Sequence, residues 1–338
     1  MTQRVGNKAV VIGLTSFLLL GIAVRAYADH VVGMTPLIWG VESLYGPEVM
    51  DWYGQRRMWL GGWLTPADRN WAQGATCGAD RSNVYGGDKI YYSDYVNGAW
   101  TTPVLSFAKV GYHVNEFGVV RPPSSDGIDR SQWLYLYYSQ LSNNDALCLG
   151  QNLNLKQHHE IGFASSVDGG RTWFDHGVII RYWQSGDGLG AWGPAPVVVG
   201  QEIRLFYFTG TNSFFQSPIF MRRLNANGHV PLTADMRVAF TNYNAFNPST
   251  ILLNPHIAVR GNDLVMVGQV NNFHDVAKYR SSNGGFLWSP DPGVIIPGGP
   301  NFLAEPSIEV TSPSSYRIFF GFGTPDSNSV HQWDLQSP

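Results

Sequence analysis

The decisive stretch of this sequence reads Ser165-Ser166-Val167-Asp168-Gly169-Gly170-Arg171-Thr172-Trp173. It predicts a tight β-turn, because Asp168 can accept backbone N–H bonds and the two glycines tolerate positive φ. Trp173 then buries a large ring where the next strand begins. Two segments that match this motif more loosely indicate an internal repeat. They are Ser281-Ser282-Asn283-Gly284-Gly285-Phe286-Leu287-Trp288 and Asn97-Gly98-Ala99-Trp100.

The composition indicates abundant core material punctuated by turn residues. Of 338 residues, 44% are hydrophobic and only 14% are charged, with 38 Gly and 20 Pro. This balance favours a compact all-β protein over a helical or disordered one. The length allows two ordinary domains, but closed all-β architectures also reach this size as one unit.

The N-terminus predicts a secretory signal peptide. Arg4 and Lys8 precede an apolar stretch from Ala9 to Ala23, and Ala26-Tyr27-Ala28 has the small-x-small form of a cleavage site. An uncleaved membrane anchor is the alternative, although the apolar core is shorter than the usual span of about 20 residues. We therefore expect a signal peptide at 1–28 and a single domain at 29–338. The mature chain would have no membrane span and would be secreted or periplasmic.

Charge and cysteine content narrow the class of partner and the compartment. Cleavage after residue 28 removes three basic residues and no acidic one, so the formal charge would change from −3 to −6. Nucleic-acid binders present basic patches, so we expect no nucleic-acid partner. Cys77 and Cys148 are consistent with an oxidising compartment and predict one disulfide, with free buried thiols as the alternative.

A longer repeat predicts the architecture. Five segments combine a small polar or acidic residue with a short β-branched run, and a strand rich in aromatic or aliphatic residues follows each. The segments begin 70, 79, 59 and 51 residues apart, which suits four-stranded antiparallel blades with loops of different length. We therefore predict a five-bladed β-propeller. The segments are 46–49, 116–119, 195–198, 254–257 and 305–308.

The last blade lacks a fourth strand, because too little chain remains after Leu335. An open strand edge invites aggregation, so we expect the segment from Val31 to Trp39 to supply the outer strand and close the ring. A loosely docked N-terminal arm is the alternative.

Propeller geometry predicts which residues share a face. Residues just before each inner strand converge on one end of the axial channel, whereas Asp168 and Asn283 fall on the opposite face and are predicted to be structural. Cys77 and Cys148 fall in loops on the channel-mouth face. The converging polar and aromatic set is Glu48, Glu116, Glu305, His113, Asn115, Asn254, His256 and Trp192, to which the starts of third strands add Asp88, His159 and His274.

Carboxylates gathered near an axis shift each other's pKa values, which is how hydrolases separate an acid from a base. We therefore interpret Glu116, Glu305 and Glu48 as candidate catalytic residues, with capping of strand N–H groups as the alternative. The other converging side chains are candidates for binding substrate. No compact metal-ligand spacing is present, so we predict no metal or cofactor. Calcium in the axial channel is an alternative that no ligand motif in the sequence supports.

The mature chain resembles five-bladed glycoside hydrolases of the arabinanase and xylosidase type, family 43 and relatives such as family 32. The blade-initial acids and the run Asp88-Lys89-Ile90-Tyr91-Tyr92-Ser93 before Trp100 carry the resemblance. It implies three carboxylates on the first three blades. Glu116 matches the second, but Gly46 and Ala195 stand at the first and third. The turn motif itself resembles the Asp box of sialidases. Those enzymes bind the substrate carboxylate with three arginines, and no predicted inner strand of this chain begins with arginine.

These patterns predict a glycosidase that acts on a poly- or oligosaccharide as a monomer. The alternative is a non-catalytic propeller that binds glycan or serves as a scaffold in envelope or exopolysaccharide assembly.

Overall fold

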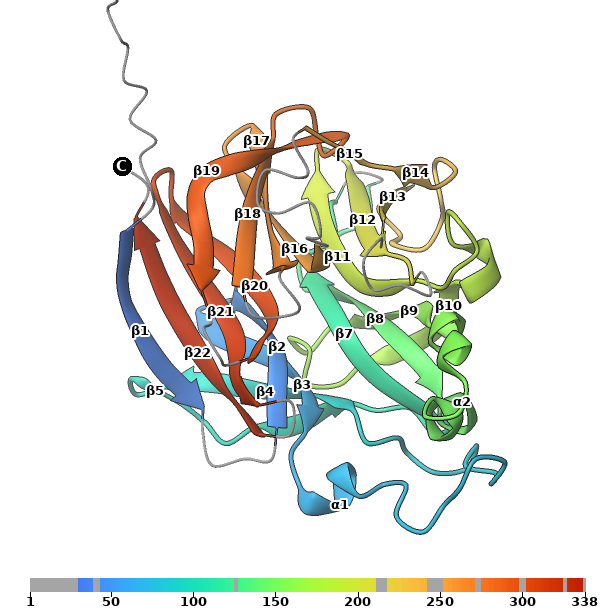
Figure 1. The fold of residues 1–338 in the computed structure, drawn as a ribbon. Coiled ribbons are helices and arrows are strands. Elements are labelled where there is room, and N and C mark those ends of the chain that lie inside the picture. The colour runs from blue at the N-terminus through green and yellow to red at the C-terminus, as the bar shows by residue number, and fades with distance from the viewer. Residues whose placement is uncertain are drawn as a thin grey trace, which may run out of the picture.

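A computed structural model describes residues 30–38, 43–124, 127–210, 218–241, 252–270, 275–297, 302–324 and 327–336. The strands of these residues form five sheets set around a common axis, which confirms the five-bladed propeller (Figure 1). The predicted signal peptide lies outside the described residues. No helix among the described residues is long and apolar enough to cross a membrane.

The first three blades follow the chain from the inner to the outer strand. Blade 1 contains β2 (Ser43–Trp52), β3 (Gln55–Trp63), β4 (Lys89–Val96) and β5 (Ala99–Trp100), with β6 (Val104–Phe107) also paired to β4. Blade 2 contains β7 (Tyr112–Val120), β8 (Leu134–Ser142), β9 (Glu160–Ser166) and β10 (Phe174–Ile180). Blade 3 contains β11 (Trp192–Val199), β12 (Glu202–Phe208), β13 (Ile219–Leu224) and β14 (Met236–Arg237).

The last two blades each recruit a strand from elsewhere in the chain. Blade 4 contains β16 (Leu253–Arg260), β17 (Asp263–Val270), β18 (Asp275–Ser281) and β19 (Leu287–Pro297), with β15 (Ala239–Phe240) parallel to β19. Blade 5 contains β20 (Phe302–Ser312), β21 (Ser315–Thr324), β22 (Ser327–Gln336) and β1 (His30–Ile38). The short helices are α1 (Pro66–Arg69) and α2 (Asn143–Cys148), with 3₁₀ turns at Leu153–His158 and Tyr182–Gln184.

The N-terminal strand closes the ring as predicted. β1 pairs antiparallel with β22, from His30 opposite Gln336 to Ile38 opposite Val330. Ile38 is buried in a cluster with Leu44 of blade 1 and Phe319 of blade 5, so β1 contributes core as well as backbone pairing. The described strand ends at Ile38, and Trp39 lies outside the described residues.

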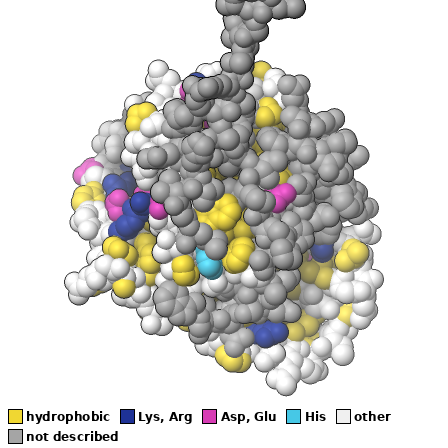
Figure 2. All heavy atoms as spheres, turned by 60° about the vertical axis from the view of Figure 1, so that its left-hand side comes forward, with side chains coloured by type: hydrophobic (Ala, Val, Ile, Leu, Met, Phe, Trp, Pro, Cys, Tyr) yellow, Lys and Arg dark blue, Asp and Glu magenta, His cyan; other side chains and the backbone are white. Residues whose placement is uncertain are grey.

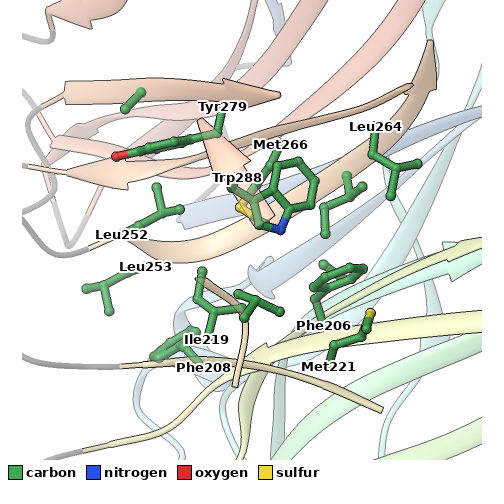
Figure 3. Close-up of a cluster of buried hydrophobic side chains, with 14 of the residues drawn as sticks. Phe206, Phe208, Ile219, Met221, Leu252, Leu253, Leu264, Met266, Tyr279 and Trp288 are labelled. Atoms are coloured by element: carbon green, nitrogen blue, oxygen red, sulfur yellow. The ribbon is translucent and has the colours of Figure 1, made fainter. Parts of the chain in front are cut away.

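The hydrophobic core lies between neighbouring blades, because each blade buries both faces. β8 illustrates the pattern, since all its residues except Ser142 are buried. Between blades 3 and 4, Phe206 and Met221 of blade 3 face Met266 and Trp288 of blade 4 (Figure 3). Such burial is the main favourable contribution to folding.

The turn at Asp168 is structural, as the sequence predicts. The Oδ1 atom of Asp168 accepts hydrogen bonds from the backbone N–H groups of Arg171 at 3.0 Å and Thr172 at 3.1 Å. Ser166 Oγ accepts the N–H of Gly170 at 2.9 Å. The second motif repeats this geometry, with Asn283 and Ser281 in the equivalent roles.

These turns also join neighbouring blades. The backbone carbonyl of Gly169 accepts from the Arg57 guanidinium of blade 1, and Gly170 accepts from Trp59 Nε1 at 2.9 Å. In blade 4, the carbonyl of Gly284 accepts from Arg204 of blade 3. Each turn therefore anchors the second strand of the preceding blade.

The segment at Asn97 differs from the other two motifs. Asn97 and Gly98 have φ values of 51° and 86° and form a two-residue loop between β4 and β5. Asn-Gly is the preferred sequence of such hairpins, because both central residues take positive φ. The prediction of a third copy of the turn motif is therefore wrong, since the resemblance came from the hairpin loop and the tryptophan after it.

Replacing Asp168 should destabilise the protein without touching the channel. Asp168→Ala removes the acceptor of two backbone N–H groups, and we expect a loss of about 2 kcal/mol in the free energy of unfolding. Asn283→Ala should cost less, because it removes the acceptor of one backbone N–H group. Urea unfolding of both variants measures this order. Equal stability of Asp168→Ala and wild type would contradict the structural role.

Candidate functional site

Each inner strand contains one residue with left-handed backbone geometry at an interruption of its pairing with the second strand. Their φ values lie between 40° and 56°. A non-glycine residue in this region carries about 1–3 kcal/mol of strain, which is retained where the surroundings enforce it and is common at functional sites. The five residues in blade order are Gly46, Glu116, Gly193, Asn254 and Glu305.

The left-handed residue marks a β-bulge in each inner strand, and its position corrects the alignment of the sequence repeat in blade 3. In blade 3 the left-handed residue is Gly193, whereas the sequence repeat places Ala195 at that position. Gly193 precedes Pro194 just as Gly46 precedes Pro47, but Pro196 offers a second, competing match after Ala195. The correction leaves the conclusion about this blade unchanged, because neither residue is an acid.

The two glycines lie beside carboxyl groups from neighbouring blades. Glu116 Oε2 accepts the N–H of Gly193 at 3.2 Å, and that N–H also points to Ser139 Oγ at 3.0 Å. The Glu305 carboxyl lies against Gly46, where an added Cβ would collide with it. Gly46 therefore leaves open the space that the Glu305 carboxyl occupies, whereas a Cβ at Gly193 would meet Phe208 and Asn254.

Burial alters the acidity of both carboxyl groups. Desolvation raises the pKa of Glu116 to about 7, against the lowering effect of hydrogen bonds from Gly193 and Ser139. Desolvation, followed by the charge of Glu116, raises the pKa of Glu305 well above its usual value. The charge of Asp88 raises both. At neutral pH the pair therefore holds at least one proton.

The predicted acids and their polar neighbours gather around one small axial cavity of about 30 Å³, which has room for roughly one or two water molecules. Asn254 Nδ2 donates to Gln269 Oε1 at 2.6 Å, while its buried Oδ1 has no hydrogen-bond partner among the described residues. The predicted residues that line this cavity are Glu48, Glu116, Asn254, His256 and Glu305.

Glu48 is engaged by a partner that the sequence does not indicate. His256 Nε2 lies 2.6 Å from Glu48 Oε2, and His256 Nδ1 accepts the N–H of Ile308 at 3.1 Å. Because Nδ1 accepts, the Nε2 proton is the one donated to Glu48. Glu48 and His256 also line a wider cup of about 730 Å³. The pair thus lies where the axial cavity and the cup meet.

Asp88, whose charge raises the pKa of both acids, lies beside the predicted His113. Tyr45 donates its hydroxyl to Asp88 Oδ1 at 2.5 Å, and His113 Nδ1 lies 3.0 Å from Asp88 Oδ2. His113 Nε2 is buried without a hydrogen-bond partner among the described residues, and the Trp71 ring packs edge-on against this histidine, with centroids 4.3 Å apart. Tyr45 was missed by sequence reasoning because its role depends on Asp88, which lies 43 residues away.

The remaining predicted residues extend this cluster. His159 packs against Trp192 with ring centroids 4.1 Å apart, and its Nδ1 donates to the carbonyl of Lys156 at 2.8 Å. Burial lowers the pKa of His159 to about 4, so the ring is neutral at working pH. Asn115 directly precedes Glu116 in β7. His274 lies outside the described residues.

The predicted disulfide between Cys77 and Cys148 is present, with Cα atoms 4.7 Å apart. It joins the loop after α1 in blade 1 to the end of α2 in blade 2. Asn143 reinforces the contact by donating to the carbonyls of Arg81 and Val84. The loop that carries Trp71 over His113 is therefore fixed to blade 2. Among the described residues, no group of three His, Cys, Asp or Glu side chains could hold a metal ion.

No protein-family model matches this chain, and no curated protein matches its sequence. Solved structures do match its fold. The β-xylosidase RS223 superimposes with a TM-score of 0.64 at 10% identity, covering 90% of this chain and 95% of that one. A family 117 glycoside hydrolase from Zobellia galactanivorans gives 0.61 at 13% identity, covering 92% and 91%. A family 43 endo-arabinanase from Bacillus licheniformis gives 0.57 at 15% identity, covering 89% and 96%.

At these identities the comparisons concern the fold. They confirm that the chain shares the five-bladed propeller of glycoside hydrolases, as its sequence resemblance implies.

Proposed function

We propose that this chain is an exported glycosidase that cleaves a glycosidic bond of a poly- or oligosaccharide through carboxylates at the channel mouth. The observation that carries the proposal is the Glu116–Glu305 pair, which holds a proton at neutral pH within a fold shared with glycoside hydrolases. Export is supported by the predicted signal peptide and by the disulfide, which forms in oxidising compartments.

The pair supplies two different chemical roles. Desolvation and the charge of Glu116 hold the pKa of Glu305 well above its usual value, and we assign Glu305 as the proton donor to the leaving oxygen. Glu116, with a pKa of about 7, provides the ionised form that acts as base or nucleophile. His113, which lies beside Asp88, binds the sugar hydroxyl groups, and Trp71, which packs against His113, contacts the apolar face of the sugar.

A second candidate function is a non-catalytic glycan-binding or scaffold propeller. Two observations favour it. The Glu116 carboxylate is occupied by the N–H of Gly193, and glycines stand at the bulges of blades 1 and 3, where the resemblance implies acids. Glu116 then has a structural role, because its carboxylate accepts a backbone N–H of the neighbouring inner strand.

Glu116→Gln separates the two functions. On a glycan cleaved by the wild type, identified from a panel of plant and bacterial polysaccharides, we expect kcat/KM to fall about 100- to 10,000-fold, the usual contribution of a general acid or base. Glu202→Gln is the matched control, because Glu202 pairs with Arg204 and Arg223 away from the cavity. Unchanged cleavage by Glu116→Gln would refute the assignment. Glycan binding without cleavage by the wild type would favour the second function.

A further inference from the structure

A groove of about 930 Å³ lies at the junction of blades 5 and 1, and none of its lining residues lines the axial cavity. One wall is the segment 35–38 of β1, and the other is the hairpin formed by β4 and β5. Arg56, Arg317 and Gln332 lie between these walls. Its volume is within the range of roughly 300–1,000 Å³ that is typical of sites for small ligands.

The hairpin wall presents two aromatic rings. The Asn97-Gly98 loop reverses the chain so that Tyr95 and Trp100 face each other across the strands, with ring centroids 5.2 Å apart and planes at 60°. Tyr95 is 42% exposed. Trp100 packs against the cluster that contains Ile38 and is therefore held in place from behind. Rigid, partly exposed rings offer a flat apolar surface at low entropic cost.

The polar part of the groove is neutralised by a series of alternating charges that crosses from blade 1 to blade 5. Arg56 lies between Asp51 at 3.3 Å and Glu309 at 2.6 Å. Arg317 lies between the same Glu309 at 3.3 Å and Asp334 at 2.8 Å. Figure 2, which brings the left-hand side of Figure 1 forward, likewise shows basic and acidic side chains lying side by side.

This arrangement decides the class of ligand. Both arginines are compensated by carboxylates, so the groove offers little attraction to a phosphate or an acidic sugar. The exposed Asp51 carboxylate and the exposed Thr102 hydroxyl line the groove, and an alkyl chain would displace their water without offering a hydrogen bond in return. A pyranose or furanose ring satisfies both requirements, because its C–H face packs on aromatic rings and its hydroxyls bond with planar polar side chains.

We propose that this groove is a second saccharide site, which holds a neutral glycan chain on the outer side of the ring. The inference rests on the proposed function for its ligand class, carbohydrate. Because the groove is separate from the axial cavity, it would raise the local concentration of a polymer at the enzyme without contacting the bond that is cleaved. Short substrates would gain nothing from it.

Binding is tested in the Glu116→Gln background, so that the probe is not consumed. Isothermal titration with xylohexaose, 1,5-α-arabinohexaose and cellohexaose, and with hexagalacturonate as the anionic control, identifies the sugar. For the neutral probe that binds, we expect Tyr95→Ala and Trp100→Ala each to weaken one binding event at least tenfold. Trp183→Ala is the matched control, because Trp183 is a 56% exposed aromatic residue outside the groove. Tyr95→Ala keeps the test valid if Trp100→Ala fails to fold.

The outcomes separate this inference from the proposed function. If Tyr95→Ala in the otherwise wild-type enzyme raises KM for the polymer but not for a trisaccharide, the groove site is supported. If both groove variants bind the hexasaccharide and the polymer as the wild type does, the groove inference fails while the proposed cleavage stands. If only hexagalacturonate binds at the groove, or no glycan does, the inference also fails. Binding at the groove by a chain that cleaves nothing would refute the proposed cleavage alone.

Discussion

Deletion of residues 1–38 is expected to abolish the folded monomer, whereas deletion of residues 1–28 leaves it intact. The longer deletion removes β1, which pairs with β22 at seven positions. At about 1 kcal/mol for each net hydrogen bond, this loss alone is on the order of 5 kcal/mol. It is comparable with the whole stability of a typical domain, about 5–15 kcal/mol. The loss of Ile38 from its cluster adds to the effect.

The exposed edge of β22 determines how the shorter protein fails. An unpaired strand edge is a template for association, so we expect aggregates or strand-exchanged oligomers in place of a cooperative monomer. Light scattering and thermal melts of the two deletions measure the difference. A synthetic peptide covering residues 29–39 should restore the melt in trans. A 39–338 protein that stays monomeric and melts within a few degrees of the 29–338 protein would show that the ring does not depend on β1.

Ring closure could be predicted from the sequence because it follows from counting strands. The repeat leaves the last blade one strand short, and only the segment after the signal peptide is unassigned. The structural role of Asp168 was predictable for a similar reason, since its hydrogen bonds reach residues within four positions of it in the chain. Local chemistry and strand number are both visible in the order of the residues.

The partners of the site residues were not predictable in this way. Glu48 and His256 are 208 residues apart, and nothing in either segment indicates their bond. The contact of Glu305 with Gly46 likewise depends on blades 5 and 1 being neighbours in the closed ring. The sequence places an acid, a glycine or an asparagine at each bulge, but only the ring shows that each acid lies beside a glycine of the next blade.

The Glu116→Gln variant is expected to be more stable than the wild type at alkaline pH, although it should have lost activity. A carboxyl group whose folded pKa is raised binds more protons in the folded state than in the unfolded state. Its favourable contribution is complete below the unfolded pKa of 4.5 and is lost as pH rises through about 7. This difference corresponds to about 3 kcal/mol for Glu116, and glutamine does not incur it.

The comparison between variants removes the titration of His159 from the measured difference. His159 works in the opposite direction between pH 4 and 6.5, because burial lowers its pKa and the unfolded chain binds the proton. Its contribution is common to wild type and Glu116→Gln and cancels in their difference. Glu202→Gln is again the control, since ion pairs with Arg223 and Arg204 hold the pKa of Glu202 below its usual value against the effect of burial. Its contribution therefore changes only in more acidic solution.

Urea unfolding at pH 4.5, 6 and 8 measures the difference in stability. We expect Glu116→Gln to match the wild type near pH 4.5 and to exceed it by about 3 kcal/mol at pH 8. The substitution also removes the charge that raises the pKa of Glu305, so that residue should ionise at lower pH in the variant. A constant difference across the three pH values would mean that Glu116 is already ionised as in water. The protein would then have no proton-sharing pair with which to divide the roles of acid and base, and the glycosidase proposal would lose its central observation.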